Sequence, residues 1–195
     1  VLFRSTHLVQ CMLDFEAALA EAEAREGLIP TASAAVIRRA CDVTAFDVEA
    51  IGKASRSAGS VAIPLVKALT AHVATLDEAA SRVVHKGSTS QDVIDTGNAL
   101  VTREALGLID ASLTRLIDTL TKLATEHTHT PILARTLMQP ATVTTLGFKI
   151  TGWLAPLQRS RAALTELADS ALALQLGGAV GTLSALGEDG PSVAR

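Results

Sequence analysis

The sequence feature that most constrains the fold is a proline-free helical pattern from Ser90 to about Glu126. It contains only two glycines, and its apolar residues recur at spacings of three and four, as on one face of an α-helix. At about 1.5 Å per residue, such a helix would exceed about 50 Å. A helix this long is unusual in a compact small domain, so the pattern indicates a long bundle, often an oligomeric one.

The first 80 residues are also patterned for helices. Leu8–Glu26 carries one apolar stripe, and Ala32–Cys41 favours a short helix. Thr44, followed by Asp47, predicts the N-cap of another helix, and Pro64 fits the first turn of a further one. No segment of the chain alternates with period two for long enough to predict a strand. We therefore predict an all-α fold.

A second long helical pattern runs from about Thr144 to Leu174, and Pro156 predicts a kink in it. "GGAVG" at 177–181 interrupts the pattern. It resembles a dinucleotide-binding loop, but it follows a helical pattern rather than a strand, so that interpretation fails. The charges of "AEAEARE" at 20–26 are predicted to form a solvated helix face.

Composition and charge exclude several classes of protein. The formal net charge is −3 and no basic stripe stands out, which argues against nucleic acid as a partner. The longest apolar runs are too short to span a bilayer. Cys11 and Cys41 fit neither a disulfide framework nor a zinc site, so we expect buried, reduced thiols in a cytoplasmic protein and no metal site.

Three consecutive hydroxyl residues, Ser88, Thr89 and Ser90, stand at the start of the longest helical pattern, in "KGSTSQDVIDT". We call Lys86–Gln91 the hydroxyl segment. One interpretation is structural, with Thr89 capping the helix and its neighbours solvated. The other is functional, because a helix N-terminus with hydroxyl groups and a glycine can hold a carboxylate or phosphate. His85, immediately upstream, could add a donor or move a proton.

A second polar cluster lies between the two long patterns, in "ARTLMQPATVTTLG", where we expect a loop. Arg135, Thr136 and Gln139 belong to it. Threonine hydroxyls and a glutamine amide suit recognition of a carboxylate or an amide. The alternative is a polar turn whose threonines cap the next helix and whose arginine is a surface charge.

Three segments, in order, resemble signatures of the fumarase/aspartase superfamily. They are "HKGSTSQDVIDTG", "ARTLMQPATVTTLGFK" and "LQLGGAVGTLSALG". Within that superfamily, "MLDFEAALAEAEAREGLIP" and "AGSVAIPLVKAL" make the chain most similar to bacterial cycloisomerases that act on 3-carboxy-cis,cis-muconate. The resemblance implies an N-terminal helical domain at 1–85, followed at 86–195 by the first part of a central bundle of long helices.

The resemblance also implies a function. Enzymes of this kind add a carboxylate of 3-carboxymuconate across a carbon–carbon double bond to give 4-carboxymuconolactone, in the β-ketoadipate pathway of aromatic degradation. They are homotetramers with active sites shared between subunits, take small polycarboxylates and need no metal or organic cofactor. The residues implied to bind substrate are Ser88, Thr89, Ser90, Gln91, Arg135, Thr136 and Gln139. His85 is the catalytic candidate, for binding or proton relay.

The sequence departs from the superfamily pattern in two ways. A third signature, a loop of the form GSSxMPxKxNP that supplies a serine for proton transfer, is absent, so we expect an N-terminal fragment that is inactive alone. Pro140 stands where some cycloisomerases carry a histidine. Two alternatives therefore remain: a lyase similar to adenylosuccinate or argininosuccinate lyase, which releases fumarate, and a helical scaffold without catalysis.

Overall fold

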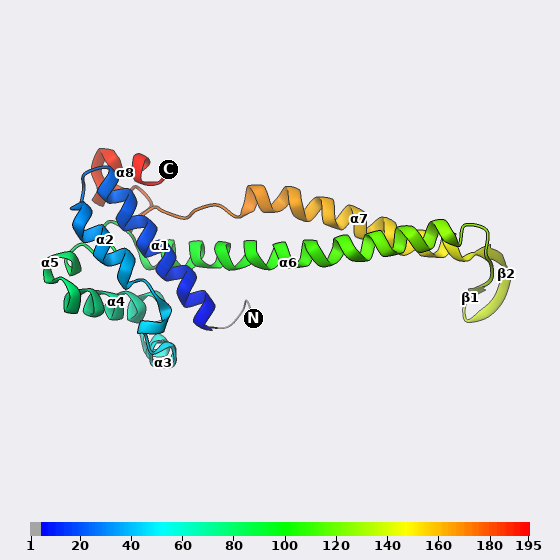
Figure 1. Cartoon of the computed structure of the whole chain (residues 1–195), viewed down its shortest axis with the longest axis horizontal. Helices are drawn as coiled ribbons and strands as arrows, with labels where there is room; N and C mark the ends of the chain where they lie inside the picture. Colours follow the sequence, from blue (N-terminus) through cyan, green and yellow to red (C-terminus); the bar gives the residue numbers. More distant parts are fainter. Residues whose placement is uncertain (1–4) are drawn as a thin grey trace. The chain divides into compact units, whose positions relative to one another are not determined.

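A computed structural model describes residues 5–195 as a largely helical protein (Figure 1). Its elements, in chain order, are α1 (Ser5–Arg25), α2 (Thr31–Ala40), η1 (Val43–Ala45), α3 (Val48–Ala58), α4 (Ala62–Leu76), α5 (Glu78–Ser81), α6 (Ser90–Glu126), β1 (Pro131–Thr136), β2 (Gln139–Thr145), α7 (Leu146–Ala171), η2 (Ser184–Asp189) and α8 (Gly190–Val193). The helical fold class predicted from the sequence is confirmed.

The chain forms two compact units. The first contains the chain up to Thr102 together with Leu172–Arg195, and the second contains Arg103–Ala171. Helix α6 therefore contributes its N-terminal part to the first unit and the rest to the second. The division into domains at residues 85 and 86 stays a prediction.

The hydrophobic core of the first unit lies around α1. Met12, Leu13 and Ala17 on that helix are fully buried, as are Leu65 and Leu69 on α4. Leu186 and Val193, from the end of the chain, belong to the same core. Burial of these side chains removes apolar surface from water, the main favourable term in folding. The last residues are thus an integral part of the first unit.

The long helices follow the sequence pattern closely. Helix α6 covers the 37 residues Ser90–Glu126, as predicted. Helix α7 begins two residues after the predicted start near Thr144 and continues through Pro156. Within the second unit, Arg161 of α7 donates to both carboxylate oxygens of Asp110 on α6, over 2.6 and 3.1 Å. This bidentate pair links the two helices.

The prediction that Thr44 caps a helix is wrong, because aspartates cap both helices in this region. Asp42 accepts a hydrogen bond from the Thr44 N–H and opens the short helix η1. Asp47 is the N-cap of α3, because its carboxylate accepts from the Ala50 N–H over 2.9 Å. Aspartate is at least as favourable as threonine at an N-cap, so Asp47, which immediately precedes α3, takes the N-cap position of that helix.

The loop expected between the long helices is instead a β-hairpin. Strands β1 and β2 pair antiparallel, with Thr136 opposite Gln139 and Arg135 opposite Pro140. A bulge interrupts the register between Leu133 and Arg135. The strands are mostly exposed on both faces, so the alternation that a half-buried strand shows is missing from the sequence.

Within residues 5–195, no helix is both long and apolar enough to cross a membrane.

Candidate functional site

The hydroxyl segment leads directly into the first turn of α6. The side chains of Ser88, Thr89 and Ser90 are all half-buried. Among the described residues, no protein group hydrogen-bonds the Thr89 or Ser90 hydroxyl, and Ser88 Oγ makes only long contacts, the shorter to Asp92 Oδ2 at 3.4 Å. The first N–H groups of a helix lack intrahelical acceptors and carry partial positive charge. Available hydroxyls and N–H groups together suit an anionic ligand.

Asp92 holds the hydroxyl segment in place. Its side chain is buried, and its Oδ1 accepts a hydrogen bond from the Gly177 N–H over 3.0 Å. Its Oδ2 accepts from the Gly178 N–H over 2.9 Å and from the Thr89 N–H over 3.0 Å. Three backbone donors thus satisfy the carboxylate. The cap at this helix start comes from Asp92 and leaves the Thr89 hydroxyl available.

Thr96, one turn further along α6, fixes the same loop. Its hydroxyl accepts from the Gln175 N–H over 3.0 Å and lies 3.1 Å from the Gln175 carbonyl, to which it donates. A Cβ on Gly178 would lie 2.9 Å from the Gly87 carbonyl oxygen. The "GGAVG" loop is therefore rich in glycine because its backbone packs against the backbone of the hydroxyl segment.

His85 pairs with a buried carboxylate of α1. Its Nδ1 lies 2.6 Å from Oε1 of Glu16. Burial lowers the pKa of His85, but the hydrogen bond and charge of Glu16, with smaller effects of Asp92 and Glu23, outweigh burial and raise the pKa above its ordinary value. The imidazolium form of His85 is therefore favoured beside the hydroxyl segment.

Glu23, two turns beyond Glu16 on α1, contradicts the prediction of a solvated face for "AEAEARE". Its side chain is completely buried, and neither carboxylate oxygen has a hydrogen-bond partner among residues 5–195. Burial raises the pKa of Glu23 to about 7, although the charge of Lys86 opposes this. The Lys86 ammonium donates to the Leu28 carbonyl over 2.7 Å. Glu23 is thus protonated over much of the range in which exposed glutamates are charged.

Sequence reasoning missed Glu16, Glu23 and the anchoring role of Asp92. A signal for the two glutamates existed, since Glu16 follows Met12 by four residues and so lies on the apolar face of α1. The partners of Asp92 gave no signal, because they lie 85 and 86 residues further along the chain.

The other predicted site residues lie in the second unit, at the hairpin tip (Arg135–Gln139). Thr136 and Gln139 are cross-strand partners, so their side chains share one face of the hairpin. Arg135, Thr136 and Gln139 are all exposed. The structure brings Thr136 and Gln139 together, and it brings His85 together with the residues of the hydroxyl segment. Each group belongs to its own unit.

A pocket of about 230 Å³ lies between α6 and α7 within the second unit. Its lining includes the Asp110–Arg161 pair and three leucines, Leu106, Leu113 and Leu164. None of the predicted site residues lines it. The chemistry indicated by the sequence therefore lies elsewhere, at the start of α6 and at the hairpin tip.

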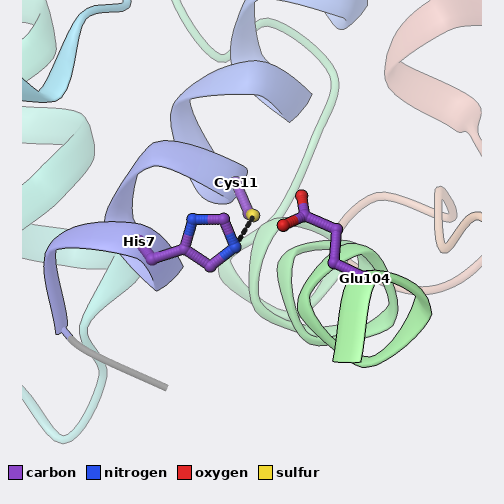
Figure 2. A group of neighbouring side chains, drawn as sticks. All are labelled: His7, Cys11 and Glu104. Carbon is purple, nitrogen blue, oxygen red and sulfur yellow. Dashed lines mark hydrogen bonds between the residues drawn. The ribbon is translucent and has the colours of Figure 1, made fainter. Parts of the chain in front are cut away.

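Figure 2 shows a histidine and a cysteine one turn apart on α1. The Nε2 atom of His7 lies 3.8 Å from Sγ of Cys11. Glu104, also labelled, belongs to the other unit. The imidazole and thiol supply two ligands, fewer than the three or four protein ligands of a typical transition-metal site, so the pair by itself defines no metal site.

Comparison with known proteins identifies the family. A family model described as "Lyase" matches residues 3–195. The chain therefore belongs to this lyase family, the fumarase/aspartase superfamily that its motifs resemble.

Several relatives share a more particular description. The chain is 50% identical over 191 residues to a 3-carboxy-cis,cis-muconate cycloisomerase of Bradyrhizobium diazoefficiens, covering 98% of this chain and 42% of the relative. It is 50% identical over 186 residues to the enzyme of the same description from Pseudomonas aeruginosa, covering 95% and 40%. The crystal structure of 3-carboxy-cis,cis-muconate lactonizing enzyme from Pseudomonas putida matches with a TM-score of 0.97 at 49% identity, covering 99% and 44%. The chain thus spans less than half of each relative's length.

Proposed function

We propose that the protein containing this chain is a cycloisomerase that converts 3-carboxy-cis,cis-muconate to 4-carboxymuconolactone. The observation that carries the proposal is the hydroxyl segment, whose Thr89 and Ser90 hydroxyls are available at the start of α6. The identity of about half the residues to cycloisomerases supports the choice of substrate. The reaction belongs to aromatic degradation through the β-ketoadipate pathway.

The proposed reaction is an intramolecular addition. A carboxylate oxygen of the substrate attacks one carbon of a C=C bond, a C–O bond forms, and the electron pair of the double bond moves to the adjacent carbon. That carbon bears a carbanion whose charge spreads onto its carboxylate, until a proton adds there. Donors aimed at this carboxylate stabilise the transition state more than the substrate.

In this scheme Ser88, Thr89, Ser90 and Gln91 bind a substrate carboxylate, together with the first N–H groups of α6. The imidazolium of His85 adds a positive charge or relays a proton. We propose that Arg135, Thr136 and Gln139 also bind substrate. The chemistry calls for no metal or organic cofactor, because side chains and backbone N–H groups perform each of these tasks.

We also propose that the protein is a cytoplasmic homotetramer whose active sites are shared between subunits. Large apolar side chains are exposed on the helices of the second unit, among them Leu108, Ile109, Leu164 and Leu167. Exposed apolar surface of this kind marks sites of association. Cys11 and Cys41, both buried thiols, support a reducing compartment. Light scattering after size-exclusion chromatography would measure the assembly.

The test is an assay of the full-length gene product with 3-carboxymuconate, followed by the loss of absorbance of the conjugated diene. Turnover to a lactone is expected. Changing both Thr89 and Ser90 to Ala should lower kcat/KM by about 10- to 100-fold, the effect of losing hydrogen bonds to a charged group. Thr119→Ala, which removes an exposed hydroxyl of α6 that donates to the Arg115 carbonyl, is the matched control and should change little.

A folded, tetrameric protein that leaves 3-carboxymuconate unchanged would contradict the proposal. Release of fumarate from a succinyl substrate would favour a lyase similar to adenylosuccinate or argininosuccinate lyase. A protein that does neither, yet binds polycarboxylates, would favour a helical scaffold or binding role.

A further inference from the structure

The candidate for a further role is Glu16, a carboxylate buried in the middle of α1. It is 1% exposed, in a helix whose neighbouring buried residues are mostly apolar. Burying a carboxylate costs free energy of folding unless the carboxylate is hydrogen-bonded, so the partner of Glu16 affects stability. Its Oε1 lies 2.6 Å from Nδ1 of His85, and its Oε2 has no hydrogen-bond partner within the described part of the chain. Glu16 therefore makes its hydrogen bond to a single imidazole.

This contact determines which ring nitrogen carries the proton. An ionised carboxylate accepts hydrogen bonds and cannot donate them. Beside an ionised Glu16, Nδ1 of His85 is the donor, and Nε2 is left as the nitrogen that gains or loses a proton. The backbone of His85 has a φ of 59°, in the left-handed region that non-glycine residues seldom adopt. The surrounding structure thus holds His85 in an unfavourable conformation in which its ring meets Glu16.

We propose that Glu16 is a positioning residue: it holds the ring of His85 in the Nδ1–H form, so that Nε2 is the atom that meets the substrate. This inference rests on the proposed function, because it gives His85 its orientation toward a carboxylate ligand. Among residues 5–195, Glu16 hydrogen-bonds only the histidine, and it acts through that residue.

The charges around His85 support a cationic ring. Glu16 lies on α1 and Asp92 lies on α6, and both favour the imidazolium. Glu23, also on α1, favours it only once its own carboxyl ionises, at a pKa of about 7. Lys86, the next residue in the chain, directs its ammonium to the Leu28 carbonyl. Nε2–H of an imidazolium is a charged donor for a substrate carboxylate, and such hydrogen bonds are stronger than neutral ones. Glu16 thus determines both the orientation and the charge of His85.

The test compares two glutamates of the same helix. Glu16→Gln keeps an oxygen that can accept from Nδ1–H but removes the charge. Glu23→Gln makes the same chemical change two turns away, at a buried carboxylate with no hydrogen-bond partner. Nitrogen-15 NMR of the histidine rings in the ligand-free, full-length protein measures the tautomer and titration of His85. Wild type should show the Nδ1–H form on the alkaline side and a titration above pH 6.5, the ordinary value for histidine.

Glu16→Gln should lower the midpoint of the His85 titration by about one pH unit or more, as expected for loss of a neighbouring opposite charge. Glu23→Gln should shift it less. In the cycloisomerase assay, the fall of kcat/KM at alkaline pH should move to lower pH in Glu16→Gln by a matching amount, with about a tenfold loss at pH 8. A residue that only stabilised the fold would not move that profile.

Several outcomes would overturn the inference. One is a wild-type His85 in the Nε2–H form, which needs no variant and so does not depend on how Glu16→Gln folds. Another is an equal shift in both variants. A third is an unchanged pH profile of kcat/KM in an active Glu16→Gln protein. If wild type shows the Nδ1–H form and the expected titration but no turnover of 3-carboxymuconate, the proposed function fails, while the control of His85 by Glu16 stands.

Discussion

The hydroxyl segment and the hairpin tip carry two groups of predicted binding residues, yet the protein builds them in opposite ways. The hydroxyl segment is half-buried, and Asp92 and Thr96 hold the glycine-rich loop against it through backbone hydrogen bonds. The hairpin tip is exposed, and its turn residues Leu137 and Met138 are 94% and 90% exposed with positive φ. Its own unit gives this turn little support.

The difference separates a part of the site that is preformed from a part that depends on its surroundings. The first unit alone determines the geometry of Ser88–Ser90, because the residues that hold it belong to the same unit. The hairpin tip presents large apolar side chains in a backbone conformation that favours asparagine and glycine. Strain and exposed apolar surface at one place indicate a function rather than a contribution to stability.

The largest loss of stability at the hydroxyl segment is expected from Asp92→Ala. It leaves the Gly177, Gly178 and Thr89 N–H groups without their acceptor in a buried region. We expect the free energy of unfolding to fall by about 3–5 kcal/mol, since each orphaned buried donor costs about 1–3 kcal/mol. Urea unfolding measures this. The control is Asp95→Ala, which removes an exposed acid that accepts only from the Gln91 side chain and should cost less than about 0.5 kcal/mol.

A smaller effect is expected from Gly87→Ala. The residue has a φ of 71°, and an added Cβ would lie 2.4 Å from Cδ2 of the buried Leu186. Strain and overpacking together should lower the free energy of unfolding by about 2–4 kcal/mol. Gly59→Ala is the matched control, with a φ of 69° and open space at the Cβ position, so it should cost only about 1–2 kcal/mol. Equal losses would show that the contact with Leu186 adjusts freely.

The pH dependence of stability tests the burial of Glu23 in the first unit. Its pKa is raised to about 7 in the folded protein, from an ordinary value of 4.5. Below pH 4.5 Glu23 is protonated in both the folded and the unfolded protein. Between pH 4.5 and 7 it ionises in the unfolded chain but stays protonated in the folded protein, which stabilises the unfolded chain. The free energy of unfolding should therefore fall between pH 4.5 and 7, by about 1–3 kcal/mol. Glu23→Gln should remove this fall in urea titrations at several pH values. A wild-type curve identical to that of the variant would refute it.

The smallest change in stability is expected at the hairpin tip. Replacing Leu137 and Met138 with Asn and Gly, which adopt positive φ readily, should raise the free energy of unfolding by at most about 1 kcal/mol. Turnover of the full-length protein is the second measurement. A stabler protein with lower kcat/KM would show that the tip works through contacts of its two apolar side chains. Unchanged turnover would show that the hairpin tip only connects the two strands and has no role in activity.

Local patterns predicted the helices well. The 37 residues of α6 carry no proline and repeat at helical spacing, so its bounds followed from the chain alone. The hairpin could not be found in this way. Leu137 and Met138 form its turn, although neither residue favours positive φ, and its strands have no buried face to impose alternation.

The site was predictable only where a motif is contiguous. Ser88, Thr89 and Ser90 stand together in the sequence, and so their place at a helix start could be predicted. The Glu16–His85 pair spans 69 residues, and the contacts of Asp92 with the glycine loop span 85 and 86. Such contacts depend on tertiary packing, which cannot be predicted from local helix propensity or from the spacing of residues in the sequence.

The distance in sequence between Asp92 and the glycine loop also has a consequence for folding. During synthesis, α1 to α5 and the start of α6 leave the ribosome well before Gly177 and Gly178, because the whole second unit comes between them. Asp92 therefore has neither the Gly177 nor the Gly178 N–H group to accept from until 85 and 86 further residues have been made. Closing a loop of that length is entropically unfavourable and slow compared with forming local helices. The hydroxyl segment should thus be the last part of the first unit to become ordered, and a chaperone or a ligand present earlier would meet it before it is ordered.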